Sequence, residues 1–158
     1  MGGIDFVSVL ATFFHDLFTV IWMGGLIVTV ISYLPAIKES IGPGPQVKKV
    51  MQAYQKRQSV WVYISMAGLI VTGLMLSKQN PDFVHLFNFS SPYASALSIK
   101  HILVIIMIGI SLERSLILGS AKGPTTPQKE RLNLILLMVN AGLAVVVLFT
   151  SGFIAALA

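Results

Sequence analysis

Cysteine is absent from this 158-residue chain, and charged residues are scarce. Without cysteine there can be no disulfide, thiolate metal site, iron–sulfur cluster or covalently attached haem. Only 11% of the residues are charged, whereas soluble domains usually carry about a quarter. Hydrophobic residues make up 55% of the chain, which is more apolar surface than a soluble core of this length can bury. The composition therefore indicates an integral membrane protein.

Long hydrophobic runs are abundant. A hydrocarbon core about 30 Å thick needs about 20 apolar residues in a helix. Four stretches reach or approach this length, at residues 4–34, 60–76, 94–118 and 132–157. Prolines and glycines separate them, and we expect Pro35 and residues 41–45 to end the first. The sequence predicts an all-α fold, an integral membrane four-helix bundle with up-down-up-down topology in a single transmembrane domain.

Basic residues gather in two of the connections between these stretches. Five of the 11 Lys and Arg residues follow the first stretch, and four follow or end the third. The positive-inside rule puts these loops in the cytoplasm and both termini outside, in a plasma membrane. The same bias explains the net charge of +5, so we expect no nucleic acid partner. In the first basic loop, residues 47–58 suit a short helix on the membrane surface or a solvated loop.

One helical face of the first stretch carries most of its polar groups. Its members recur every three or four residues: Ser8, Thr12, His15, Thr19, Trp22, Leu26, Thr29 and Tyr33. A polar face in a membrane helix turns towards other helices, so we expect the imidazole of His15 to lie in the protein interior.

The other stretches carry shorter faces of small or polar residues. In the second stretch these are Ser65, Gly68 and Thr72, followed by Gly73. Small residues at such spacing let helix backbones approach closely. The third stretch carries His101 on a weaker stripe, and the fourth carries Asn133 and Asn140 on one face. We expect Asn140 to form a hydrogen bond to another helix, because an unpaired amide in lipid is costly.

Two histidines lie at similar depths in the first and third stretches, which both run inward. His15 is about 16 Å and His101 about 10 Å from the start of its stretch, at about 1.5 Å per residue. These depths agree because the first stretch is too long to lie wholly in hydrocarbon. In a simple bundle these helices are diagonal neighbours, about 11–14 Å apart. Neutral imidazoles across such a gap suit the two axial positions of haem b. Copper bound by His15, His101 and either His85 or a methionine is an alternative, as are histidines with a purely structural role.

Two charged residues accompany the histidines. Asp16 follows His15 and Lys100 precedes His101, so on facing helices both would project to the same side. They would pair with each other, or Lys100 would reach a haem propionate while Asp16 handles a proton. Asp16 and Lys100 are therefore the candidate catalytic residues.

Three segments resemble a known membrane family. "HDLFTVIWMGGL" (15–26) resembles the first helix of the copper-resistance D family, with a histidine before Trp-x-Gly-Gly. "GLIVTGLML" (68–76) is similar to its Thr-Gly-Leu helix ending, and "IKHILVIIMI" (99–108) to its helix that starts with a lysine. The same elements resemble the haem-associated J-type membrane protoporphyrinogen oxidases, which implies roles for His15 and Lys100. Trp22, the tryptophan of the Trp-x-Gly-Gly pattern, is a further candidate cofactor-binding residue. His101 is an addition to both patterns and favours a second axial ligand.

We therefore expect a membrane redox protein that binds haem b non-covalently through His15 and His101. It would transfer electrons, or oxidise a quinol or another small molecule, near the outer face of the membrane. A copper-binding or copper-transport protein and an accessory subunit without a cofactor are the alternatives. The expected partners are the lipid bilayer, a quinol or a redox protein, and a homo-oligomer is compatible with the sequence.

Overall fold

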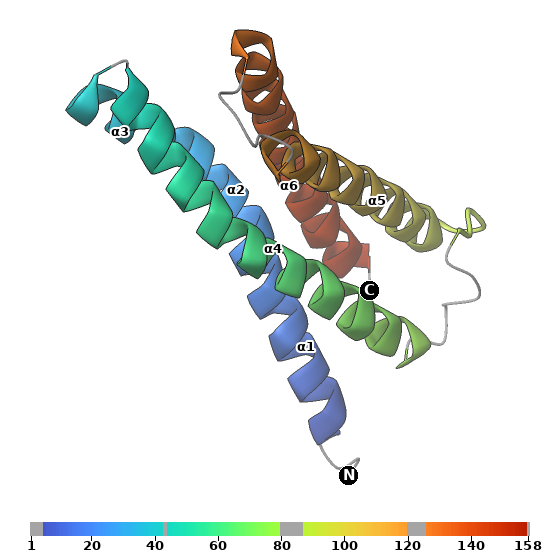
Figure 1. Ribbon diagram of the computed structural model, residues 1–158. Helices are drawn as coiled ribbons and strands as arrows, with labels where there is room; N and C mark the ends of the chain where they lie inside the picture. Colours follow the sequence, from blue (N-terminus) through green and yellow to red (C-terminus); the bar gives the residue numbers. More distant parts are fainter. Residues whose placement is uncertain (1–4, 43, 80–86, 120–125, 158) are drawn as a thin grey trace. The chain divides into compact units, whose positions relative to one another are not determined.

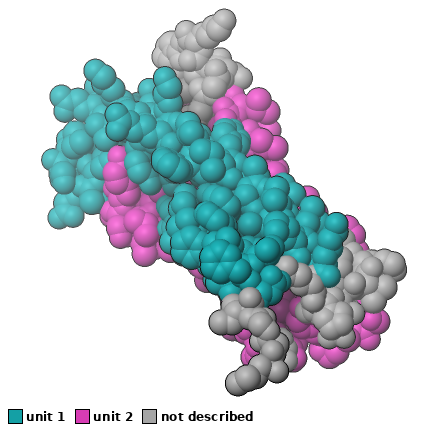
Figure 2. Space-filling view, turned by 90° about the horizontal axis from the view of Figure 1, so that it is seen from below, with its two compact units in different colours: residues 1–25, 36–84 teal, residues 26–35, 85–158 magenta. Residues whose placement is uncertain are grey.

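The computed structural model describes residues 5–42, 44–79, 87–119 and 126–157 (Figure 1). All secondary structure in these ranges is helical. Four helical segments are long and apolar enough to cross a membrane, which confirms this part of the predicted fold: Phe6–Ile41, Pro45–Lys78, Pro92–Leu116 and Pro127–Leu157. The chain forms two compact units, which Figure 2 colours separately. Unit 1 holds residues 1–25 and 36–84, and unit 2 holds residues 26–35 and 85–158.

An aspartate caps the first helix, α1 (Phe6–Thr19). A carboxylate oxygen of Asp5 accepts a hydrogen bond from the backbone N–H of Val7 at 3.1 Å. This bond satisfies one of the donors that a helix start leaves unpaired. The hydroxyl of Ser8 donates to the other carboxylate oxygen, and this bond holds the pKa of Asp5 below its usual value.

Prolines occupy the first position of the three other long helices, α4 (Pro45–Gln79), α5 (Pro92–Gly119) and α6 (Pro127–Leu157). Proline is tolerated there because the N–H that it lacks would have no partner within the helix. Ser91 and Thr126 cap α5 and α6, since their hydroxyl oxygens accept backbone N–H bonds at 3.1 and 3.4 Å.

Two π-helical turns interrupt the first long helix. After α1 come η1 (Val20–Gly24), α2 (Gly25–Val28), η2 (Thr29–Tyr33) and α3 (Leu34–Ile41). The prediction that Pro35 ends this helix is wrong. The N–H of Leu34 bonds to the carbonyl of Thr29, five residues earlier, and this wider turn relieves the clash of a proline ring with the preceding turn. The helix ends before Gly42, whose φ of 74° strongly favours glycine.

Residues 45–59 form the first part of α4, so they are neither a separate surface helix nor a loop. The segment is rich in Gln, Lys, Met, Ala and Arg, which have high helix propensity, and it lacks an internal glycine or proline. Its polarity therefore does not interrupt the helix. The 35 residues of α4, at about 1.5 Å each, make a rod of about 52 Å, well beyond the hydrocarbon thickness of about 30 Å.

In unit 1, α1 and η1 pack against α4, and the paired segments run in opposite directions (Figure 1). The aromatic rings of Phe14 and Phe18 stack along α1 with centroids 6.1 Å apart. Buried apolar side chains on these helices include Ala11, Met23, Met66 and Leu69.

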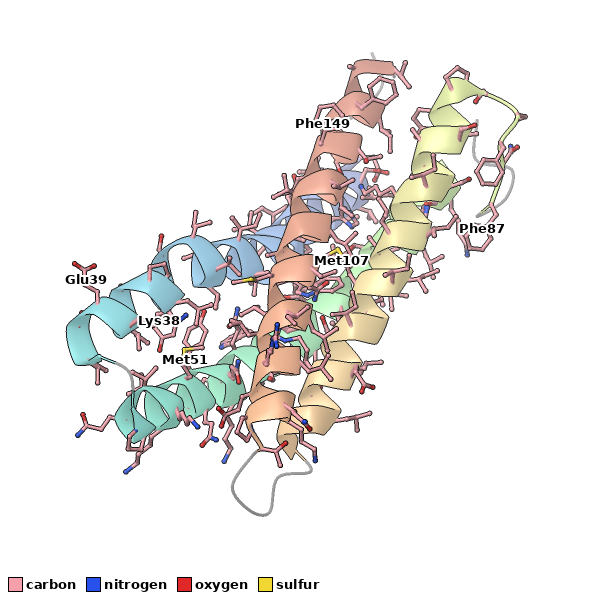
Figure 3. All side chains as sticks on the ribbon, turned by 90° about the horizontal axis from the view of Figure 1, so that it is seen from above. Lys38, Glu39, Met51, Phe87, Met107 and Phe149 are labelled. Carbon is pink, nitrogen blue, oxygen red and sulfur yellow. The ribbon has the colours of Figure 1, made fainter. Side chains whose placement is uncertain are left out.

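In unit 2, α5 packs against α6, and η2 also contacts α6. Met107 on α5 is fully buried, whereas Phe149 projects from α6 with 75% of its surface exposed (Figure 3). The amide of Asn140 donates to the hydroxyl of Ser111 at 2.9 Å, which confirms the predicted hydrogen bond to another helix. Exposed apolar and buried polar side chains are the pattern expected of helices that face lipid.

Candidate functional site

His15 lies on α1 and contacts α4 through its side chain. Its Nδ1 is 2.9 Å from the hydroxyl oxygen of Thr72, and that hydroxyl donates to the carbonyl of Gly68 at 2.7 Å. A hydroxyl has only one hydrogen, so the oxygen of Thr72 must accept from His15. The proton of the imidazole is therefore on Nδ1, and in the neutral ring the lone pair lies on Nε2.

Glycines allow α4 to come close to α1 around this histidine. A Cβ added at Gly68 would lie 2.6 Å from Cζ of Phe18 and closer still to two other ring carbons, which is nearer than real contacts permit. A Cβ at Gly73 would lie 3.6 Å from Cε1 of His15, an ordinary van der Waals distance. The face of small residues on the second stretch thus meets the aromatic and histidine side chains of α1.

His101, on α5 in unit 2, is held through the same ring nitrogen. Its Nδ1 is 2.7 Å from the carbonyl oxygen of Leu97, one turn earlier in the helix. A carbonyl oxygen can only accept, so Nδ1 carries the proton and the lone pair of the neutral ring again lies on Nε2. Histidines that ligate metals are commonly oriented in this way, with the other nitrogen donating to a carbonyl or a similar acceptor.

The segment that precedes α5 is fastened to the helix close to His101. The backbone N–H of Asn88 donates to the hydroxyl of Ser98 at 2.9 Å, and this hydroxyl donates to the carbonyl of Asn88 at 2.8 Å. Ser98 is buried, and it lies one helical turn before His101. Phe87, beside this anchor, is 50% exposed (Figure 3). The paired bonds fix where the segment meets α5.

Two buried polar groups of unit 1 have no hydrogen-bond partner among the residues that the structure describes. They are the indole nitrogen of Trp22, in η1, and the hydroxyl of Ser65, in α4. Both side chains are 0% exposed. A buried tryptophan N–H or serine hydroxyl normally finds a partner, because burying an unpaired polar group is costly.

The predicted site residues fall in both units. His15, Asp16 and Trp22 belong to unit 1, whereas Lys100 and His101 belong to unit 2. Asp16 is exposed and Lys100 is half-buried. The pairing of these two charges and the sharing of one iron by the two histidines stay predictions. His85 lies outside the described residues.

The hydrogen-bond partners of the two rings were not predicted from the sequence. The sequence pattern places Thr72 on a face of small residues that approaches a neighbouring helix. A hydroxyl on such a face is available to a histidine of that helix. Leu97 precedes His101 by four residues, and a histidine side chain can reach the carbonyl at this spacing within one helix. Residue spacing thus contained a signal for both contacts.

Across the described ranges, no three or more His, Cys, Asp or Glu side chains come together in a group that could hold a metal ion. Comparisons with protein-family models, curated proteins and solved structures gave no match.

Proposed function

We propose that this chain is an integral membrane redox protein that binds haem b non-covalently, with His15 and His101 as iron ligands. The observation that carries the proposal is the contact of Nδ1 of each ring with an acceptor oxygen, from which we infer that the lone pair of a neutral imidazole lies on Nε2. Haem iron takes histidine ligands through such a nitrogen and needs no other protein ligand type. When bound, haem would supply one-electron transfer by its iron.

The residues around His15 fit the demands of such a ligand. The hydroxyl oxygen of Thr72 accepts a hydrogen bond from Nδ1–H, and its own hydrogen bonds to the carbonyl of Gly68. The two bonds fix the ring plane and its tautomer. The backbone of α4 at Gly73 lies beside the edge of the ring, where an added Cβ would be 3.6 Å from Cε1. The carbonyl oxygen of Leu97 orients the ring of His101 in the same way.

The charged residues next to the two histidines would act on the substrate and the cofactor. Asp16 would accept or release a proton when a quinol or another small molecule is oxidised, and Lys100 would neutralise an acidic group of the cofactor. Copper held by the same histidines is the alternative function. We favour haem because it needs only imidazole ligands, whereas a copper site would draw on additional donors.

Absorption spectroscopy tests the proposal directly. Protein purified from haem-replete cells should show a Soret band and sharp reduced α and β bands. His15→Ala and His101→Ala should each lower the haem content or change the spectrum, while His85→Ala, the remaining one of the three histidines, should not. Stoichiometric copper without haem, or an unchanged spectrum in both variants, would refute the assignment.

We further propose the up-down orientation expected from the basic residues, with both termini outside the plasma membrane and the basic connections in the cytoplasm. The chain has no cysteine, so single cysteines can report sidedness. In intact cells an impermeant maleimide should label Ser90→Cys, whereas Ser40→Cys should react only after permeabilisation. Both positions are exposed. The reverse labelling pattern would show that the orientation is opposite to the one proposed.

A further inference from the structure

We infer that Trp22 and Ser65 form a binding site in unit 1 for the carbonyl oxygen of a quinone ring. The two side chains would both donate hydrogen bonds to that one oxygen. The choice of a quinone rests on the proposed redox function, whereas the need for an acceptor follows from the two unpaired donors.

The register of α1 and η1 against α4 puts the two residues at one level. His15 meets Thr72, Phe18 meets Gly68, and Gly25 meets the side chain of Gln58, so the segments advance in opposite directions. Trp22 follows His15 by seven residues, and Ser65 precedes Thr72 by seven. Seven residues are about two turns of the regular helix α4, so Ser65 returns to the face of α4 that carries Thr72. Trp22 lies in the π-helical turn η1, which packs against α4, and its side chain is buried.

Both groups are donors in need of an acceptor. The indole Nε1–H of Trp22 can only donate. Most serine and threonine hydroxyls in such helices donate to the carbonyl four residues earlier, as Ser59 and Thr72 do at 2.7 Å, but Ser65 does not. The two groups do not bond to each other. A carbonyl oxygen has two lone pairs and can accept from both.

The two helical segments that carry the donors favour a neutral acceptor. Neither residues 17–37 of the first helix nor residues 58–77 of α4 include a charged residue. These segments would offer a buried carboxylate or phosphate no counter-charge, at a high desolvation cost. A membrane-soluble ring with carbonyl oxygens meets the requirement, and a quinone is such a molecule.

The backbone at Trp22 departs from the α-helix. Residues Val20–Gly24 form a π-helical turn, a feature that occurs frequently at functional sites because it re-aims side chains. In this turn Trp22 is buried, together with Met23. The irregular backbone thus coincides with the unpaired donor.

Indole NMR signals of the full-length protein in lipid nanodiscs test this site. Trp22 and Trp61 are the only tryptophans, so ¹⁵N-tryptophan labelling gives two indole N–H signals, which Trp61→Phe assigns. Titration with decylubiquinone should move the proton signal of Trp22 downfield in a saturable way. The signal of Trp61, which is 57% exposed, should not saturate.

Removal of the serine hydroxyl supplies the decisive comparison. Ser65→Ala should weaken the apparent affinity for decylubiquinone about threefold to tenfold, the value of one hydrogen bond. Ser59→Ala on the same helix is the matched control, because its hydroxyl already bonds to the carbonyl of Gln55. The inference would be overturned if the two variants had equal affinities for decylubiquinone or if the Trp22 signal showed no saturable shift. It would also be overturned if the Trp22 indole proved to contact only water.

Haem content measured on the same samples separates the two proposals. A saturable shift of the Trp22 signal in protein that takes up no haem would leave the quinone site standing and refute haem binding. Full haem occupancy without that shift would refute the quinone site alone.

Discussion

Replacing Gly68 with alanine tests the close approach of α1 and α4. The new methyl carbon would lie 2.6 Å from Cζ of Phe18 and nearer still to Cδ2 and Cε2, whereas non-bonded carbons prefer about 3.5–4.0 Å. Phe18 stacks on Phe14, so its ring cannot move without disturbing a second aromatic side chain. The ring must rotate or the two helices must separate.

The size of the effect follows from two opposing terms. Overpacking of this kind costs about 1–3 kcal/mol. Alanine favours the helix over glycine by about 0.5–1 kcal/mol, which offsets part of that cost. We therefore expect Gly68→Ala to lower the free energy of unfolding by about 1–2 kcal/mol.

Equilibrium unfolding in mixed micelles with rising SDS, followed by circular dichroism, measures this loss. Gly142→Ala on α6 is the matched control, since its Cβ would meet nothing within 4 Å and the variant should keep or gain stability. Phe18→Leu in the Gly68→Ala background should restore part of the loss, because the smaller side chain leaves room for the methyl group. Equal stability of the two alanine variants would show that the close approach does not exist.

Three further substitutions probe hydrogen bonds. Thr72→Val should weaken haem binding about 10- to 100-fold, as the loss of other partners that orient metal ligands does, and haem transfer to an acceptor protein measures this change. Thr150→Val is the control, because its hydroxyl bonds only within its own helix, and it should not weaken haem binding. Equal losses in the two variants would contradict the orienting role of Thr72. Ser111→Ala should destabilise the protein by about 1–3 kcal/mol in the same SDS titration, because it leaves the buried amide of Asn140 unpaired, and a neutral result would argue against their contact. Ser98→Ala should speed hydrogen exchange in the segment that precedes α5, and unchanged exchange would mean that the anchor does not hold it.

Periodicity in the sequence predicted part of the set of polar side chains that turn inward, although Thr12 on the predicted face is exposed. Trp22 and Thr29 are buried and His15 is half-buried, as expected for the polar face of the first stretch. Asn140 bonds to α5, because a lone amide in an apolar helix has few other ways to be satisfied. Such inferences succeed because the cost of an unpaired polar group in lipid is large compared with other local preferences.

Hydropathy and proline positions were poorer guides to helix boundaries. Residues 45–59 are too polar to lie in hydrocarbon, yet polarity says nothing against a helix, and their high propensity extends α4 to Pro45. Pro35 is accommodated because the preceding turn is π-helical, and neither hydropathy nor the position of a proline predicts such i to i+5 bonding. The orientation of each imidazole likewise depends on contacts that only three-dimensional structure supplies.

The two π-helical turns bear on how this chain should be aligned with other sequences. Each one accommodates an additional residue within an otherwise continuous helix. A relative with an ordinary α-helix at either place would be one residue shorter there, and the correct alignment would put a single-residue gap inside a membrane span. Gap penalties that forbid breaks in such spans would instead shift the histidine of one chain away from its counterpart in the other.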